Sequence, residues 1–273
     1  ILSGFDIAAN AAVTLAGAHM NIPVAHIQGG EVTGTIDESI RHAMSKFAHY
    51  HFAANEDACE RLIKMGEMPE RVFNVGCPSI DAIIAVKDNK KIMEKYNLAQ
   101  PYFVLIQHPV TSEISKSKEQ IEITLKALQK TEANTLIILP NNDAGYSSIV
   151  KNIKDSKIKS VETLSINDYV NLLRHSSGLI GNSSSGIHEA ASFDIPVVNI
   201  GTRQQGRLRP KNVIDVDHDV EEIIKAIHEC KKIKNEGVVF NNPYGDGKSS
   251  VKIVELLKCI EIGDEIIQKR ITY

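Results

Sequence analysis

Short continuous apolar runs alternate along the chain with longer segments in which apolar residues recur every three or four positions. The runs, which have the length of buried strands, lie at residues 22–27, 50–54, 72–75, 102–106, 135–139, 158–161, 178–181 and 196–201. The periodic segments, which predict helices, lie at residues 7–20, 35–47, 57–65, 79–86, 121–128, 167–175, 220–230 and 251–267, with others around Ile149 and from about Ile187. This alternation is typical of parallel sheets that are buried on both faces, so the pattern predicts an α/β fold.

The alternation falls into two halves, and the polar, charged residues 87–91 (KDNKK) are the best candidate for a linker between them. Each half is expected to form a sheet that binds ligand at the carboxyl ends of its strands, with the two sheets facing each other across a cleft. The chain starts at Ile1 without a Met, as though a strand were already ending. We therefore expect that an N-terminal segment is absent from this sequence.

Composition narrows the classes of function. The 273 residues are 42% hydrophobic and 24% charged with a net charge of -3, which indicates a soluble globular protein. There is no Lys/Arg stripe with interleaved aromatics and no apolar run of about 20 residues, so neither nucleic-acid binding nor a membrane span is expected. The four cysteines are widely spaced without a CxxC pair, which predicts neither a zinc site nor a disulfide framework and fits a cytoplasmic protein.

Residues 178–191 (GLIGNSSSGIHEAA) indicate a strand, a tight turn and the start of a helix. The first amides of a helix attract anions, and the hydroxyls of Ser183 and Ser184 can donate to phosphate oxygens. Glu189 is expected in the first turn of the helix, where its carboxylate could accept from a ribose diol. An ordinary Ser-capped helix without a ligand remains the alternative.

Polar side chains recur directly after the predicted strands. In an open α/β sheet this edge is where ligands bind. The residues concerned are Asp6, Gln28, Glu31, His108, Asn141, Asn182 and Arg203.

Four carboxylates, Asp6, Glu31, Asp37 and Glu38, are expected to converge from consecutive loops of the first sheet. Paired carboxylates in a closed cleft can acquire separated pKa values and share the roles of acid and base. Helix capping is the alternative for Asp37. Arg41, one turn later, could lie near these groups or form a structural ion pair.

Histidines supply the other titratable candidates. His108 stands at a strand end before a proline and is a candidate proton carrier or phosphate donor. His42, His49 and His51 fit no standard metal spacing, so we interpret them as core and surface residues and expect no metal. The chain also lacks a P-loop, a GxGxxG and a GxSxG motif, which argues against an NTPase, a nicotinamide enzyme and a nucleophilic hydrolase.

In combination these motifs resemble the hydrolysing UDP-N-acetylglucosamine 2-epimerase family of sialic-acid-type sugar biosynthesis. The resemblance covers essentially the whole chain in one order. Its segments are HIQGGEVTGTIDESIRHAMSKFAHYH (26–51), GCPSID (76–81), QHPVT (107–111), LPNNDAG (139–145), IGNSSSGIHEA (180–190), NIGTRQQGR (199–207) and YGDG (244–247).

The resemblance implies two Rossmann-like domains in the GT-B arrangement with a UDP-sugar between them. The N-terminal domain would comprise residues 1–86 plus 251–273, because the family's final helix crosses back, and the UDP-binding domain residues 92–250. Family members usually begin further upstream than Ile1, and most are homodimers or homotetramers.

The implied reaction removes the C2 proton, eliminates UDP and adds water to the glycal, releasing N-acetylmannosamine, with no metal or redox cofactor. By resemblance Asp6 and Asp37 match catalytic carboxylates, with Glu31 and His108 as further candidates. The positions that match UDP contacts are His108, Asn141, Ser183, Ser184, Glu189 and Arg203, and Asn182 lies among them.

Three positions depart from the family pattern. Ile7 stands where many members carry Arg, and Gln28 stands where sialic-acid members carry Glu. Gln cannot abstract a proton, so that role would pass to Glu31, Asp37 or Asp6. Ser147 replaces a Lys that animal members use in feedback by CMP-sialate, so we do not expect that regulation.

Several alternatives remain open on the sequence alone. The same reaction could act on UDP-2,4-diacetamido-2,4,6-trideoxyglucose, or the enzyme could be a non-hydrolysing epimerase that keeps UDP on its product. A GT-B glycosyltransferase would need an acceptor site. A UDP-sugar sensor without catalysis would fit the absent N-terminal segment and Gln28.

Overall fold

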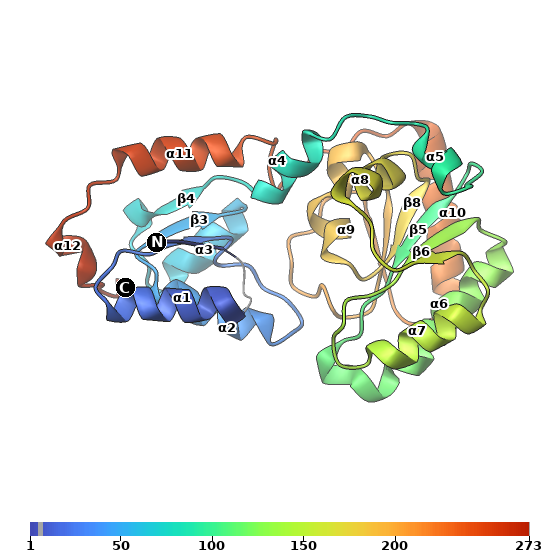
Figure 1. The fold of residues 1–273 in the computed structure, drawn as a ribbon, viewed down its shortest axis with the longest axis horizontal. Helices are drawn as coiled ribbons and strands as arrows, with labels where there is room; N and C mark the ends of the chain where they lie inside the picture. The colour runs from blue at the N-terminus through green and yellow to red at the C-terminus, as the bar shows by residue number, and fades with distance from the viewer. Residues whose placement is uncertain (5–7, 273) are drawn as a thin grey trace. The chain divides into compact units, whose positions relative to one another are not determined.

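The computed structural model describes residues 1–4 and 8–272. Asp6 and Ile7, which the sequence singled out, lie outside these ranges. The chain forms two compact units, shown in Figure 1: unit 1 comprises residues 1–82, 206–208 and 243–273, and unit 2 comprises residues 83–205 and 209–242.

Unit 1 is built on a four-stranded parallel sheet in which the strands lie side by side in chain order. These strands are β1 (Leu2–Gly4), β2 (Ala25–Ile27), β3 (Tyr50–Ala53) and β4 (Val72–Asn74). The segments between and after them form α1 (Ala8–His19), α2 (Asp37–Phe47), α3 (Glu56–Lys64), η1 (Pro69–Arg71) and α4 (Pro78–Ile84), and the chain returns to the unit with α11 (Ser249–Cys259) and α12 (Asp264–Ile267).

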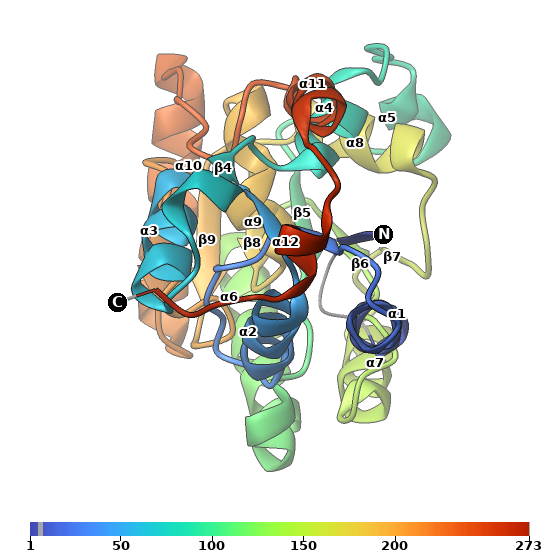
Figure 2. The same cartoon turned by 90° about the vertical axis from the view of Figure 1, so that its left-hand side faces the viewer.

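Both faces of this sheet are covered because successive side chains of a strand point to opposite faces. Phe52 packs with Ile253 of α11 on one face, whereas Ala53 packs with Leu62 of α3 on the other. Figure 1 shows α11 on one side of the strands and α1 and α2 on the other, and Figure 2 shows the segment after α11 descending past the strands through α12. Asp81 in α4 accepts hydrogen bonds from the first two amides of α11, at 3.0 and 2.6 Å.

Unit 2 contains a six-stranded parallel sheet in the order β10-β9-β8-β5-β6-β7. If β5 to β10 are renumbered 1 to 6 and the sheet is read from the β7 edge, the order is 3-2-1-4-5-6. This is the order of the doubly wound nucleotide-binding fold, in which ligands bind where the order reverses. That point lies between β5 and β8. The strands are β5 (Phe103–Ile106), β6 (Thr135–Ile138), β7 (Ser160–Val161), β8 (Gly178–Gly181), β9 (Val197–Ile200) and β10 (Val213–Val216).

The core of unit 2 lies on both sides of this sheet, which explains why its strands are continuous apolar runs. Leu105 and Ile180 pack on one face and Val104 and Leu179 on the other. The first face is covered by α6 (Ser117–Thr131), α7 (Tyr146–Asp155) and α10 (Val220–Glu236), and the second by α5 (Ile92–Lys95), α8 (Ile166–Arg174) and η3 (Ala190–Phe193). The short elements η2 (Thr111–Lys116) and α9 (Ser184–His188) follow β5 and β8.

The structure corrects three local predictions. β10 was not predicted, because the charged Asp215 interrupts its short apolar run. The helix predicted from Ile187 instead begins at Ser184 and ends after one turn. The single helix predicted at residues 251–267 is broken between α11 and α12, where Gly263 precedes the second helix.

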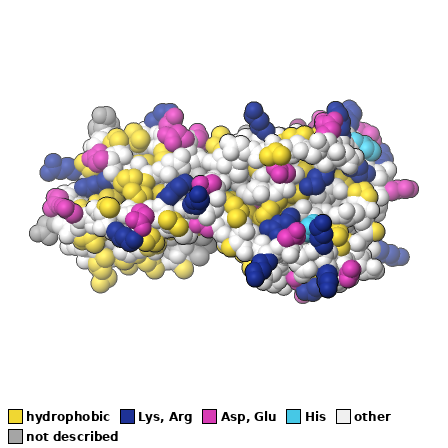
Figure 3. All heavy atoms as spheres, turned by 90° about the horizontal axis from the view of Figure 1, so that it is seen from above, with side chains coloured by type: hydrophobic (Ala, Val, Ile, Leu, Met, Phe, Trp, Pro, Cys, Tyr) yellow, Lys and Arg dark blue, Asp and Glu magenta, His cyan; other side chains and the backbone are white. Residues whose placement is uncertain are grey.

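On the face drawn in Figure 3, basic and acidic side chains are interspersed rather than gathered into a patch of one sign. Within residues 1–4 and 8–272 no helix is long and apolar enough to cross a membrane. The cysteines form no disulfide in this part of the chain.

Candidate functional site

The loops that follow β5 and β8 are joined by a reciprocal pair of hydrogen bonds. The backbone amide of His108 donates to Asn182 Oδ1 at 2.7 Å, and Asn182 Nδ2 donates back to the carbonyl of His108 at 2.9 Å. Both side chains are buried. Asn182 therefore fixes the two loops at the point where the strand order reverses, which is the expected ligand edge of this sheet.

Gly181 makes the close approach of these loops feasible. Its φ is +120°, and a Cβ placed on it would lie 2.0 Å from the carbonyl oxygen of Ile106. Only glycine tolerates such a conformation beside a neighbouring backbone. The close approach of β5 and β8 consequently requires glycine at position 181.

His108 is held as a neutral hydrogen-bond donor. Its Nδ1 accepts from the amide of Asn141 at 3.2 Å, which leaves the proton on Nε2. Burial of the ring, with a smaller contribution from the charge of Arg203, lowers the pKa of His108 to about 3. These observations favour a donor to an anion over a proton carrier at neutral pH.

The neutral state of His108 can be tested directly. The ring C–H resonances of this histidine, assigned by comparison with a His108→Gln variant, are expected to stay constant in NMR spectra between pH 5 and 8. A solvent-exposed imidazole titrates within that range, with a pKa near 6.5. A His108 titration midpoint above pH 5 would contradict the tautomer and charge described above.

Two neighbouring side chains converge on the same loop. Arg203 Nη1 and Gln204 Nε2 donate to the backbone carbonyl of Asn182 at 3.2 and 2.8 Å. Arg203 was predicted from the sequence, whereas the buried Gln204 was not. Asn182 thus acts chiefly as an anchor, and Arg203 places a cation beside His108.

Ser183 forms the N-cap of α9, which confirms the capping part of the alternative interpretation. Ser183 Oγ accepts from the amide of Ser185 at 3.4 Å, and Ser184 opens α9. Because α9 has a single turn, its dipole is weak. The hydroxyls of Ser183 and Ser184 are then the main donors that this turn offers to an anion. The hydroxyl of the partly buried Tyr169, from α8, hydrogen-bonds to Ser185 Oγ and was not predicted.

The sequence analysis placed Glu189 in the first turn of a helix, but in the structure it is the C-cap of α9. The prediction was wrong because the helix starts three residues earlier than its apolar pattern indicated. Burial raises the pKa of the Glu189 carboxyl to about 7, so near neutral pH it carries a proton part of the time. A protonated Glu189 carboxyl can both donate and accept hydrogen bonds, which suits the two hydroxyls of a ribose diol.

The raised pKa of Glu189 has a defined effect on stability. Since the value rises from 4.5 to about 7, the folded state pays no ionisation penalty below pH 4.5, an increasing one as the pH rises, and the full one above about pH 7. Glu189→Gln is therefore expected to raise the Tm of the ligand-free protein at pH 8 and to change it little at pH 5. The exposed Glu162→Gln serves as the control, and equal Tm changes at both pH values for Glu189→Gln would refute the assignment.

In unit 1, Gln28 follows β2 in a left-handed conformation with φ of +61°. Its side chain is buried, and Nε2 donates to Cys77 Sγ at 2.9 Å. Among the described residues its Oε1 is buried without a hydrogen-bond partner. The Oε1 of Gln28 can therefore accept a hydrogen bond, but the carboxamide does not act as a general acid or base.

Glu31 is the buried carboxylate of this edge. It is 5% exposed, and its Oε2 lies 3.8 Å from Nη2 of Arg207, a residue not predicted from the sequence. Arg41 Nη1 donates to the backbone carbonyl of Glu31 at 2.7 Å. The contact given for the Arg41 guanidinium is thus to the backbone of Glu31, which does not decide between the two sequence interpretations of Arg41.

Asp37 and Glu38 occupy the first turn of α2, where carboxylates are favoured. Asp37 is half-buried and accepts from the hydroxyl of Thr35 at 2.9 Å. Glu38 accepts from the amide of Thr33 at 2.7 Å, which fixes the preceding loop. Loop fixation thus falls to Glu38. The N-cap of α2 is Ile36, whose side chain makes no capping hydrogen bond, so Asp37 is not the cap that the alternative interpretation expected.

Among the described residues no group of His, Cys, Asp and Glu is arranged to hold a metal ion. His49 and His51 are both buried, in agreement with their interpretation as core residues, and His42 is half-buried.

The sequence profile described as UDP-N-acetylglucosamine 2-epimerase matches residues 5–258. The chain belongs to this family.

Curated relatives of this epimerase family share about a third of the sequence. The chain is 38% identical over 266 residues to UDP-N,N'-diacetylbacillosamine 2-epimerase (hydrolyzing) of Legionella pneumophila, covering 94% of this chain and 70% of that protein. It is 34% identical over 256 residues to UDP-N-acetylglucosamine 2-epimerase of Neisseria meningitidis, covering 90% of this chain and 67% of that protein.

Solved structures of family members share the fold. UDP-GlcNAc 2-epimerase from Neisseria meningitidis bound to UDP-GlcNAc superposes with a TM-score of 0.82 at 22% identity, over 95% of this chain and 76% of that one. The co-structure of S. aureus MnaA with UDP superposes with a TM-score of 0.77 at 22% identity, over 100% of this chain and 76% of that one. The likeness confirms the predicted α/β class with two Rossmann-like sheets.

Proposed function

We propose that this family member is a hydrolysing 2-epimerase that converts a UDP-2-acetamido sugar and water into UDP and the free 2-epimeric sugar. The observation that carries the proposal is the set of donors at the β5–β8 reversal point, where His108, Ser183 and Arg203 surround the Asn182 anchor. Relatives at 38% and 36% identity whose names specify hydrolysis support the choice over an epimerase that retains UDP.

Unit 2 is assigned the UDP moiety. His108 supplies a neutral Nε2–H, Ser183 and Ser184 supply hydroxyls, and Arg203 supplies the cation for the diphosphate. Glu189 is assigned the ribose diol. Asn141 donates its backbone amide to His108, so it contributes to binding at least by fixing that ring.

Unit 1 is assigned the proton transfers. In the elimination a carboxylate takes the C2 proton while the C1–O bond breaks and its electron pair leaves with the β-phosphate of UDP, giving a glycal. In the hydration a proton adds to C2 from the opposite face and a water oxygen bonds to C1, releasing its second proton. Glu31 and Asp37 are the described carboxylates that we assign to these steps, with Asp6 by resemblance. Gln28 is excluded because a carboxamide does not act as a general acid or base near neutral pH.

The identity of the sugar separates two candidates. UDP-N-acetylglucosamine is the substrate in the name of the Neisseria meningitidis relative, and a diacetylbacillosamine nucleotide is that in the name of the Legionella pneumophila relative. We propose UDP-N-acetylglucosamine as the substrate, with UDP-2,4-diacetamido-2,4,6-trideoxyglucose as the alternative. In both, the reacting C1 and C2 carry the same groups.

A parallel assay of UDP release tests both candidates. The intact protein is incubated with each sugar nucleotide at equal concentration, and kcat/KM is compared. Preference for the 4-acetamido-6-deoxy sugar by about 100-fold or more would assign the alternative, because a site that bonds an additional amide rejects the analogue that lacks it. Absence of UDP release from both, with UDP still bound, would overturn the proposed function in favour of a sensor.

A further inference from the structure

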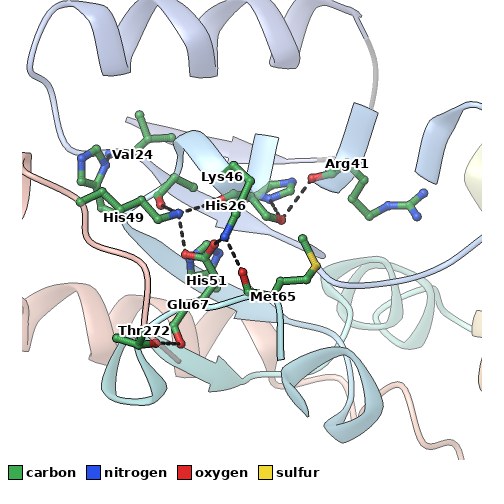
Figure 4. Close-up of polar contacts among 12 residues, drawn as sticks. Val24, His26, Arg41, Lys46, His49, His51, Met65, Glu67 and Thr272 are labelled. Atoms are coloured by element: carbon green, nitrogen blue, oxygen red, sulfur yellow. Dashed lines mark hydrogen bonds and ion pairs between the residues drawn. The ribbon is translucent and has the colours of Figure 1, made fainter. Parts of the chain in front are cut away.

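Glu67 forms a buried polar centre in unit 1 that the proposed chemistry does not use. The side chain is 1% exposed, and its carboxylate lies 2.7 Å from Lys46 Nζ, 2.9 Å from His51 Nε2 and 2.5 Å from Lys269 Nζ. Burial alone would raise the pKa of Glu67, but the bonds from His51 and the two lysines outweigh it and lower the pKa to about 2. The carboxylate is therefore ionised at neutral pH and attracts both ammonium groups. Figure 4 shows Lys46 and His51 converging on Glu67.

Lys269 joins this centre to the end of α2. Its ammonium group also donates to the backbone carbonyls of Ser45 and Ala48, at 2.7 Å each. These carbonyls lie in the last turn and at the C-cap of the helix, where a cation is favoured. An ammonium has three donors, and the three partners use all of them.

The contacts of α2 continue from Lys269 to the turn that carries Gln28 and Glu31. Ser45 Oγ donates to the carbonyl of Arg41 and lies 3.1 Å from His26 Nδ1, and a Cβ on Gly29 would lie 2.8 Å from both of those side-chain atoms. The turn therefore rests directly on Ser45 and His26. One turn earlier in α2, Arg41 holds the carbonyl of Glu31. Both His26 and Arg41 are labelled in Figure 4.

The C-terminal segment has attachments that do not involve Lys269. The amide of Thr272 donates to the carbonyl of Gly66 at 3.0 Å, and its hydroxyl donates to the carbonyl of Glu67 at 3.2 Å. Ile266 is buried, being 3% exposed. The segment is consequently expected to stay docked when the Lys269 ammonium is removed, which makes its effect on α2 separable from folding.

We propose that Lys269 is a positioning residue that holds α2 from the C-terminal segment and thereby fixes the turn bearing Glu31. The inference rests on the proposed function only for its catalytic consequence, because the effect on the turn itself is structural. The Lys269→Met substitution preserves the length of the aliphatic stem while removing all three hydrogen bonds. Lys258, an exposed α11 lysine paired with Glu255 at 2.8 Å, provides a matched control.

The test compares Lys269→Met, Thr272→Val and Lys258→Met in the intact protein. Lys269→Met is expected to lower kcat about 10-fold or more with UDP affinity within about 2-fold, and to accelerate amide exchange in residues 29–33 about 10-fold. Thr272→Val removes a tail contact that does not reach α2, so it is expected to lower Tm without changing kcat or that exchange. Lys258→Met is expected to change none of the three.

Separate outcomes identify which claim fails. If Lys269→Met lowers Tm but leaves kcat and exchange in residues 29–33 at parent values, Lys269 is only a structural residue and the inference is overturned. If the parent itself releases no UDP, the proposed function fails. The exchange comparison then still decides the positioning claim, since faster exchange supports it and unchanged exchange overturns it.

Discussion

Replacing Glu31 by Gln is expected to lower kcat by about 10²- to 10⁴-fold, the range in which a general acid or base contributes, while UDP affinity stays within about 2-fold. Glu31 is buried beside Arg207 and Arg41, so Gln fits the same space but cannot exchange a proton. UDP affinity is expected to persist because its proposed contacts come from unit 2. Steady-state kinetics and calorimetric titration with UDP measure the two quantities.

A matched control for Glu31→Gln is Glu60→Gln, at an exposed carboxylate of α3 that lies 3.4 Å from Lys64. It is expected to leave both kcat and UDP affinity unchanged. A Glu31→Gln enzyme with kcat within 10-fold of the parent would remove Glu31 from proton transfer and assign that role to Asp37 or Asp6. Asp37→Asn, measured in the same way, separates those two.

Gly181→Ala is expected to have the largest effect on stability. The new Cβ would lie 2.0 Å from the carbonyl oxygen of Ile106 and would force β5 and β8 apart at the reversal point. We expect loss of soluble protein or a decrease in the free energy of unfolding of about 4 kcal/mol or more. Urea denaturation measures the change.

Gly237→Ala separates this steric effect from the effect of the backbone conformation. Gly237 also has a positive φ, of +65°, but a Cβ there has nothing within 4 Å. That variant is expected to lose about 1 kcal/mol, the conformational term alone. Equal losses for Gly181→Ala and Gly237→Ala would show that the close approach of the two loops is not what makes glycine necessary.

The sequence predicted the two parallel sheets well because periodicity reports burial. Strands such as Phe103–Ile106 and Gly178–Gly181 carry apolar side chains on both faces, and the structure confirms that helices cover both. β10 escaped prediction because Asp215 faces Asn199 and Arg209, so a polar contact interrupts the apolar run. The register of an edge strand with such a residue depends on its neighbours, which the pattern does not report.

Site residues that the sequence missed owe their positions to contacts distant in the chain. Gln204 reaches the carbonyl of Asn182, Tyr169 reaches Ser185, and Arg207 reaches Glu31. Gln, Tyr and Arg are common at surfaces, so their identity alone gives no signal. The early start of α9 at Ser184 similarly depends on the Ser183 cap, which the apolar pattern from Ile187 does not reveal.

The most direct test of the hydrolysing 2-epimerase follows the reaction by proton NMR in D2O, with the intact protein and the sugar nucleotide that it turns over faster. The account predicts UDP together with a free 2-acetamido sugar of inverted configuration that carries deuterium at C2, because C2 is deprotonated and then reprotonated from solvent. A product that keeps UDP at C1, or a free sugar that keeps its original C2 hydrogen, would contradict it.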